Sequence, residues 1–273
     1  MSKISIITAC TDLGLNIDGA KRGAQILTKG LVSPKIAHTY ILEEKSQKEK
    51  INDKKRATNQ ENINDFVVEF NSLLLQMHEL HFEHSMDETT KKAYYQKMHD
   101  LVLSVKALDT KNEKQNLNAI NEFNQELYQL VLKVIEDENF PLTVGGDHIV
   151  AVASSLASIK RHQNLGIIWF DSHSDFNTYL TSVTGNLHGL PLAVATHYEK
   201  NILADFHDGP FYNPKNTVIV GGRDIDPWEW GNVIDSGVTV FSTEDICKHG
   251  IQTICKKAFE IANNRYKWRA YQF

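Results

Sequence analysis

The sequence predicts an α/β protein whose mostly parallel sheet is covered by helices on both faces. Short apolar runs, typical of buried strands, alternate with stretches of helical periodicity, and this order indicates βαβ units. Between the first two runs, a glycine-spaced turn is predicted at residues 14–23, followed by a helix that ends near Leu27. Six apolar runs are expected to be strands: residues 3–9, 36–42, 142–144, 166–170, 217–220 and 238–241.

A helical region at about residues 57–137 interrupts this alternation. Apolar residues recur at intervals of three and four in three segments, 63–80, 94–108 and 120–134, which predicts three amphipathic helices. Because 273 residues suit one large α/β domain, residues 1–273 are expected to form a single domain with this region as an insertion. The third stripe comprises Ile120, Phe123, Leu127, Val131 and Val134.

Composition excludes several classes of partner. The chain has 29 basic and 34 acidic residues, a net charge of −5 without a concentrated basic face, so nucleic acid is not expected to bind. No apolar run approaches the roughly 18 residues of a membrane span, so no membrane contact is expected. The first residues run directly into a strand, and none of the three cysteines forms a CxxC pair, which favours the cytoplasm. A small polar molecule is the remaining class of partner.

Two expected strand ends carry residues that suit a metal ion. The strand at 142–144 leads into Gly145-Gly-Asp-His148, and the strand at 166–170 leads into Asp171-Ser-His-Ser-Asp175. Loops at the carboxyl ends of parallel strands are the usual place for functional residues. If the second loop stays extended, its two aspartates and its histidine point the same way, and His148 completes one side of the site. Carboxylate and imidazole ligands favour divalent ions such as manganese.

A structural interpretation of the same residues is also open. Asp171, His173 and Asp175 could form a solvated loop, and His148 could cap a helix. The presence of Gly-Gly-Asp-His one βα unit earlier favours the metal site, because two loops of this kind can supply several ligands together. A carboxylate shared by two ions would allow the water between them to act as a hydroxide near neutral pH.

Three segments together resemble the signatures of the arginases. Residues 171–189, DSHSDFNTYLTSVTGNLHG, closely resemble the central arginase signature, and Gly145-Gly-Asp-His148 matches the other metal loop. Residues 222–229, GRDIDPWE, resemble the G-x-R-D-x-D-P-x-E segment. Arginases are manganese ureohydrolases that split L-arginine into ornithine and urea. The resemblance implies an arginase-like three-layer αβα fold, two Mn²⁺ ions and L-arginine as the substrate.

The resemblance also implies a role for each matching residue. One manganese would be bound by His148, Asp171 and Asp175, and the second by His173, with Asp171 bridging both. His188 would exchange protons with the leaving amine, a role that suits the pKa of histidine, although a hydrogen-bonded loop histidine is the structural alternative. The α-carboxylate of the substrate would be held by Asn177, Thr184 and Asn186, and its α-amino group by Asp226 and Glu229. The T-G-N-L-H-G pattern at 184–189 favours arginine over agmatine.

One family motif has no match. Arginases carry a later S-x-D-x-D-x-x-D-P strand end that supplies two further metal ligands, whereas no aspartate follows Asp245 in this sequence. Residues 263–273 have no strand pattern, so the last two sheet strands of the family are expected to be missing. We therefore expect a C-terminally incomplete arginase that is inactive alone. A complete chain would form the trimers or hexamers common in the family.

Two alternatives to an arginase remain open at this point. The first is a ureohydrolase-like protein that has lost catalysis and binds a partner, and the missing aspartate pair favours it. The second is an agmatinase, which belongs to the same superfamily.

Overall fold

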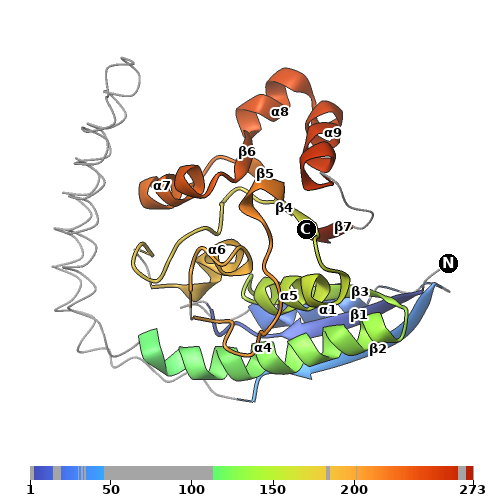
Figure 1. Ribbon diagram of the computed structural model, residues 1–273. Coiled ribbons are helices and arrows are strands. Elements are labelled where there is room, and N and C mark those ends of the chain that lie inside the picture. Colours follow the sequence, from blue (N-terminus) through green and yellow to red (C-terminus); the bar gives the residue numbers. More distant parts are fainter. Residues whose placement is uncertain are drawn as a thin grey trace, which may run out of the picture.

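The structure is a computed structural model, which describes residues 3–14, 20–29, 31, 33, 35–45, 113–182, 185–200, 202–263 and 269–272. Within these residues, all strand pairs are parallel and form two sheets, with strand orders β2-β1-β3 and β6-β5-β4-β7 (Figure 1). The strands are β1 (Ile4–Cys10), β2 (Ile36–Glu43), β3 (Phe140–Gly145), β4 (Gly166–Phe170), β5 (Thr217–Gly222), β6 (Thr239–Ser242) and β7 (Arg269–Gln272). The α-helices are α1 (Ala20–Lys29), α4 (Glu113–Glu136), α5 (Val150–His162), α6 (Pro191–Ala195), α7 (Pro227–Ser236), α8 (Thr243–His249) and α9 (Ile251–Ala262).

The six expected strands are all present, with ends that differ from the prediction by at most two residues. The predicted turn at 14–23 is wrong in its second half, because α1 begins at Ala20 and includes Gly23. This glycine faces open space, with no atom within 4 Å of a Cβ added there. A glycine in an exposed helical position costs only about 1 kcal/mol relative to alanine, so the neighbouring residues maintain the helix.

The third predicted amphipathic helix is confirmed as α4. Its stripe faces the core, since Ile120, Leu127, Val131 and Val134 are completely buried and Phe123 is 5% exposed. The other two predicted helices, at 63–80 and 94–108, lie outside the described residues. The extent of the insertion and the single-domain organisation therefore stay predictions.

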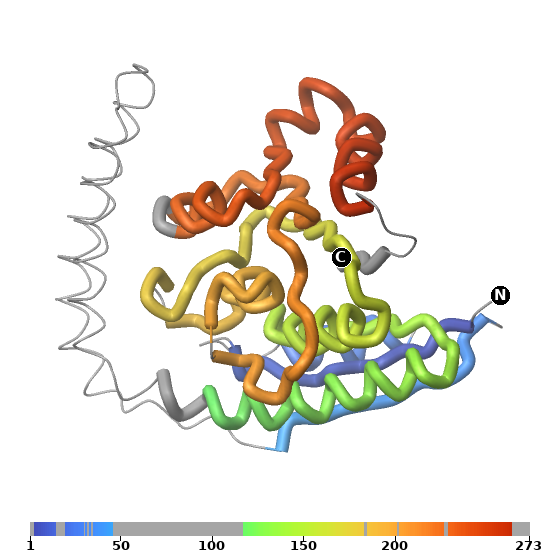
Figure 2. Tube along the Cα trace, viewed as in Figure 1, coloured from blue at the N-terminus to red at the C-terminus, as the bar shows by residue number. Residues whose placement is uncertain are grey.

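Alternation along the central strands produces the three layers. In β4, Ile167 and Trp169 pack in a core with α4, α5 and α6, whereas Ile168 packs on the opposite side with Ile254 and Ala258 of α9. Successive side chains of a strand point to opposite faces, so an unbroken apolar run covers both. The tube in Figure 2 shows α4 and α5 side by side, and α1 packs against β1 and β3. The predicted αβα architecture is confirmed.

The expectation that residues 263–273 contain no strand is wrong. Arg269–Gln272 form β7, which pairs with β4 so that Ala270 lies opposite Ile167. Main-chain groups at a strand edge can pair with any extended segment, and a four-residue strand is too short to show alternating hydrophobicity. The edge of β4 that does not pair with β5 is therefore occupied by a strand from the end of the chain. Within the described residues, the two sheets are separate.

A search of the described residues for membrane spans found no helix both long enough and apolar enough to cross a bilayer.

We predict that Gly166→Ala destabilises the fold, because a Cβ at this position would lie 2.0 Å from the carbonyl oxygen of Ala262. Displacing the end of α9 from β4 should lower the free energy of unfolding by about 1–3 kcal/mol, measured by urea denaturation. The matched control is Gly23→Ala, which should raise the free energy of unfolding by up to about 1 kcal/mol. Equal stability of the two variants would contradict the prediction.

Candidate metal centre

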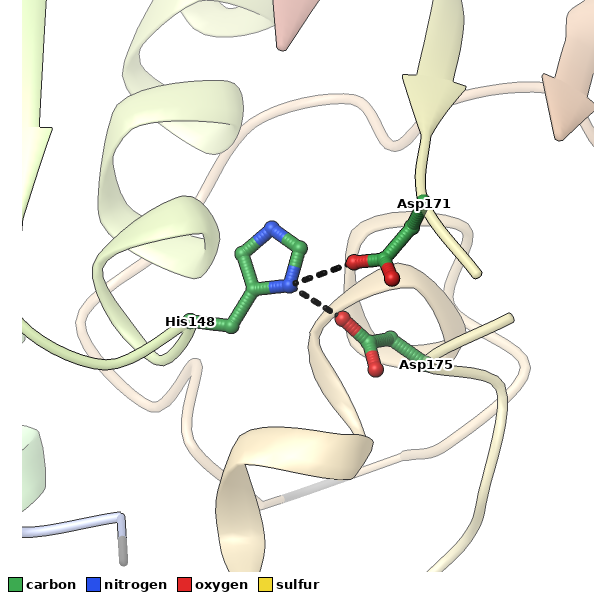
Figure 3. A group of neighbouring side chains, drawn as sticks. All are labelled: His148, Asp171 and Asp175. Atoms are coloured by element: carbon green, nitrogen blue, oxygen red, sulfur yellow. Dashed lines mark ion pairs between the residues drawn. The ribbon is translucent and has the colours of Figure 1, made fainter. Parts of the chain in front are cut away.

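His148, Asp171 and Asp175 converge at the carboxyl ends of the strands (Figure 3). His148 Nδ1 lies 3.3 Å from Asp171 Oδ2 and also forms an ion pair with Asp175 Oδ2. One ligand atom from each residue lies within 4.8 Å of the other two. In the part of the chain that the structure describes, these three form the group of side chains that could hold a metal ion.

Loops from two different sheets bring these side chains together. His148 follows β3 in the three-stranded sheet, whereas the two aspartates follow β4 in the other sheet. The imidazole of His148 stacks on the indole of Trp169, with ring centroids 4.6 Å apart. The loop of His148 also packs closely on the chain after β1. This packing requires glycine at position 146, because a Cβ on Gly146 would lie 1.7 Å from the carbonyl oxygen of Thr11.

The backbone of Asp175 adopts a conformation that is rare for a residue other than glycine. Its φ is +47°, in the left-handed region. Its carbonyl oxygen accepts hydrogen bonds from the backbone N–H groups of Leu192 (3.0 Å) and Ala193 (3.3 Å) at the start of α6. The next N–H group, that of Phe176, donates to Glu229 Oε1 at 2.8 Å. Hydrogen bonds to the carbonyl group of Asp175 and to the N–H group of Phe176 thus hold Asp175 in a backbone conformation of high energy.

The expectation that the loop after β4 stays extended is wrong. The chain bends at Ser172 and His173 before the left-handed residue Asp175. The carbonyl oxygen of Ser172 accepts hydrogen bonds from Arg223 N (2.9 Å) and Asp224 N (3.0 Å), so the loop after β5 holds the bend. As a result, Asp171 and Asp175 converge on His148, whereas His173 lies outside that group. The side chain of His173 is 56% exposed, whereas that of Asp175 is 6% exposed.

His173 lies beside the three-residue group. Its Nδ1 is 3.3 Å from Asp171 Oδ1, and its Nε2 is 3.5 Å from Asp224 Oδ2. Asp171 Oδ1 therefore faces His173, while Asp171 Oδ2 faces His148. The role of His173 as a ligand of a second ion, with Asp171 as the bridge, stays a prediction.

The electrostatics of the group suit a cation. Burial alone would lower the pKa of His148, but Asp171 and Asp175 outweigh it and raise the pKa to about 10. Burial likewise opposes ionisation of Asp171, but His148 and the backbone N–H of His173 lower the pKa of that carboxyl. The imidazolium proton therefore supplies positive charge between two carboxylates. One nitrogen and two oxygens could bind a divalent ion in place of that proton. This donor set fits manganese as well as iron or zinc.

The predicted substrate-binding residues lie on the loops around this group. The Oδ1 atom of Asn177 accepts a hydrogen bond from Thr181 Oγ1 at 3.0 Å. Partial burial raises the pKa of Asp226, and the nearby side chain of Asn177 opposes this rise. Asp226 is an exposed residue at the N-cap of α7, and Asn186 is the N-cap of the short 3₁₀ helix Leu187–Gly189. Thr184 lies outside the described residues. The structure thus brings Asn177 and Asp226 together, and the substrate contacts of these residues stay predictions.

Glu229, which the resemblance places beside the α-amino group of the substrate, is buried and bonded to the backbone. It is 3% exposed, and its two oxygens accept hydrogen bonds from the backbone N–H groups of Phe176 (2.8 Å) and Asp226 (3.2 Å). Burial is the main reason that its pKa rises to about 7, and the nearby Asp175 carboxylate adds to this effect. Its observed contacts are therefore with the backbone beside a ligand, while a contact with substrate stays a prediction.

Two residues that sequence reasoning did not single out hold the loop of His188. The Nδ1 atom of His188 lies 3.0 Å from the carbonyl oxygen of Gly14, and the N–H group of Gly14 donates to Asp147 Oδ2 at 2.8 Å. The position of Asp147 in the Gly-Gly-Asp-His motif is the sequence feature that could have drawn attention to it. The distance of 133 residues between Gly14 and Asp147 concealed their pairing.

Fold and site together match the ureohydrolase class of proteins. The chain belongs to the arginase family, whose family model matches residues 3–269.

Relatives and solved structures agree with this assignment. The chain is 32% identical to the arginase of Bacillus subtilis strain 168 over 183 residues, which cover 66% of this chain and 62% of that relative. The crystal structure of arginase from Bacillus cereus aligns with a TM-score of 0.55 at 32% identity, covering 57% of this chain and 54% of that one. The arginase of Entamoeba histolytica in complex with L-ornithine aligns with a TM-score of 0.70 at 20% identity, covering 100% of this chain and 75% of that one, and shows the shared fold. The chain thus spans about 62% of the length of its Bacillus subtilis relative.

We predict that binding of Mn²⁺ near pH 7.5 releases about one proton per ion. His148 carries that proton in the metal-free site, since its pKa of about 10 lies above the working pH. Calorimetric titrations in two buffers of different ionisation enthalpy would measure the release. Identical binding enthalpies in both buffers would contradict it.

The same pKa determines how stability changes with pH. The folded-state pKa of about 10 exceeds the unfolded value of 6.5, so the ion pair of His148 stabilises the metal-free fold fully below pH 6.5. This contribution is lost as the pH rises toward 10. Unfolding of the metal-free chain should therefore require less urea at pH 9.5 than at pH 7, and the difference should shrink in His148→Asn.

We predict that Glu229→Gln weakens Mn²⁺ binding by about tenfold or more, although Glu229 is not among the three converging ligands. Glutamine can accept only one of the two backbone hydrogen bonds, so the peptide after Asp175 loses its fixed position. The matched control is Asp208→Asn, which removes a carboxylate charge from a side chain that is 82% exposed and pairs with Lys160. Equal weakening in both variants, measured by calorimetry, would indicate loss of charge and contradict the positional explanation.

Proposed function

We propose that this chain provides the first metal site and much of the substrate pocket of an arginase, which hydrolyses L-arginine to L-ornithine and urea with two Mn²⁺ ions. The observation that carries the proposal is the convergence of His148, Asp171 and Asp175, the residues that match the arginase ligands. Membership of the family and the similarity to the arginase of Bacillus subtilis support the choice of reaction. A cytoplasmic location and assembly into trimers or hexamers are parts of the same proposal.

A divalent ion bound at this site would lower the pKa of a water molecule toward neutrality and polarise the guanidinium carbon for attack. His148, Asp171 and Asp175 would hold the first ion, and His173 with Asp171 would hold part of the second. The buried Asp175 and the stacking of His148 on Trp169 fix the ligands before the ion arrives. Preorganised ligands require little rearrangement on binding.

The surrounding loops would bind and orient the substrate. The Asn177–Asp226 pair presents an amide and a carboxylate at the edge of the site, which can bind the α-carboxylate and the α-amino group of an amino acid. Asn186 and Thr184 would add contacts to the α-carboxylate, and Glu229 would complete the acidic side facing the ammonium. Neutral amide and hydroxyl groups on one side and carboxylates on the other favour a substrate that carries both an α-carboxylate and an α-amino group. Arginine has both, whereas agmatine lacks the carboxylate.

His188 would exchange protons between solvent and the leaving amine. Its side chain is half-buried and lies against the backbone of Gly14, so the ring has a fixed orientation. An imidazole can accept and donate a proton near neutral pH, as release of ornithine and urea requires.

One observation favours a second candidate function. Within the described residues, a single three-residue group could hold an ion, and His173 lies outside it. A protein with this site could bind one ion and an amino acid without hydrolysing it. We therefore expect slow turnover from the 273-residue chain, well below that of a full-length arginase.

We predict that the chain with added Mn²⁺ releases urea from L-arginine faster than from agmatine at equal concentrations. Asp175→Asn should reduce the affinity for Mn²⁺ by more than about a hundredfold, because losing a ligand weakens binding more than losing a residue that only supports a ligand. The same variant should reduce urea release to background. The control His38→Asn changes an exposed histidine on β2 and should leave both unchanged.

Three outcomes distinguish the candidates in this assay. Faster urea release from agmatine would favour an agmatinase. Tight Mn²⁺ binding without urea from either substrate would favour the binding protein. Normal Mn²⁺ binding in Asp175→Asn would overturn the proposed metal site itself.

A further inference from the structure

A continuous path of hydrogen bonds joins His188 to the buried carboxylate of Asp147. Asp147 is 6% exposed, and its two oxygens accept hydrogen bonds from the backbone N–H groups of Gly14 (2.8 Å) and Ile149 (2.9 Å). On its other side, the same Gly14 residue offers its carbonyl oxygen to His188, at 3.0 Å from Nδ1 and 3.4 Å from the backbone N–H. Asp147 therefore determines where the Gly14 peptide lies, and Gly14 contacts His188 twice.

The contact with Gly14 determines which ring nitrogen of His188 carries the proton. A carbonyl oxygen can only accept a hydrogen bond, so Nδ1 must donate. In the neutral imidazole, the other nitrogen then carries the lone pair. His188 is thereby held in the tautomer whose Nε2 can accept a proton.

The position of Gly14 is defined by tight packing as well as by hydrogen bonds. A Cβ on Gly14 would lie 3.1 Å from Asp147 Oδ1, so the glycine allows the carboxylate to approach its backbone. The loop that carries Asp147 is fixed in turn, because Asp147 N donates to Thr11 O at 3.2 Å and Gly146 N donates to Ala9 O at 3.0 Å. Backbone hydrogen bonds therefore hold the end of β1 and the loop after β3 together.

We propose that Asp147 is a positioning residue that fixes the Nδ1–H tautomer of His188 through the Gly14 peptide. The functional meaning of this inference rests on the proposed proton exchange by His188. The geometry itself is independent of any reaction. Asp147 acts on His188 from a distance and has no contact with substrate in this proposal.

The ¹⁵N chemical shifts of the imidazole nitrogens test the proposal in the full chain without substrate or metal. His188→Gln identifies the His188 signals by their disappearance. In the wild-type chain, Nδ1 should show the shift of a protonated nitrogen and Nε2 that of an unprotonated one, at a pH where the ring is neutral. Asp147→Asn places an amide beside Gly14 that can accept only one backbone hydrogen bond, so the Nδ1–H form should fall from nearly all molecules to a minority.

A second variant changes the contact between Gly14 and Asp147 at the glycine instead of at the carboxylate. Gly14→Ala keeps the carboxyl group but places a Cβ 3.1 Å from Asp147 Oδ1, so the carboxylate and the Gly14 backbone must move apart. The fraction of the Nδ1–H form should therefore fall in this variant as well. The matched control is Asp245→Asn, which removes a carboxylate that accepts a backbone hydrogen bond from Ser242 N at 2.8 Å, at the start of α8. The control should leave the His188 tautomer unchanged.

The outcomes separate this inference from the proposed function. An Nε2–H form in the wild-type chain, or an unchanged Nδ1–H form in both Asp147→Asn and Gly14→Ala, would overturn the inference. An equal change in the Asp245→Asn control would also overturn it, because general destabilisation would then explain the effect. A chain that releases no urea yet shows the expected tautomer changes would overturn the proposed function and leave the role of Asp147 intact.

Discussion

The strained conformation of Asp175 is the constraint on which the candidate metal site depends. Its φ of +47° turns the carboxylate toward His148, and an unsupported chain would relax from this conformation. The start of α6 holds the carbonyl group, and the buried Glu229 holds the following N–H group. A helix and a carboxylate distant in sequence therefore maintain the direction of one ligand. The loop after β5, which binds the carbonyl of Ser172, maintains the bend that precedes it.

The convergence of His148, Asp171 and Asp175 could be predicted from the sequence, whereas the contacts that support these residues could not. Chemistry-bearing residues directly after buried strands form a local pattern, and His148, Asp171 and Asp175 were found that way. The hydrogen bond from Phe176 to Glu229 joins residues 53 positions apart, so no periodicity reveals it. The assumption of an extended loop failed for the same reason, because backbone hydrogen bonds to distant segments determine the bend. Local sequence shows which chemical groups follow a strand, whereas tertiary contacts determine the directions of their side chains.

The fold shows the same division. Buried strands such as β4 carry an unbroken apolar run because both faces are covered, and this signal predicted their positions within two residues. The strand β7 has no comparable signal, since its pairing with β4 uses main-chain groups that every residue possesses. Gly166 shows how a local residue can carry tertiary information. Its lack of a side chain admits the end of α9, but the sequence alone does not name Ala262 as the neighbour.

The charge balance of the site explains how the metal-free chain can retain a strained ligand. Two carboxylates facing one another would repel, and their repulsion would favour relaxation of Asp175. The proton on His148 supplies positive charge between them, which is why the pKa of this histidine rises to about 10. A divalent ion bound at the proposed site would replace the proton and would meet side chains that are already in place. The proton thus serves as the cation of the metal-free site. Because proton and metal ion would compete for His148, the affinity for the ion should increase as the pH rises.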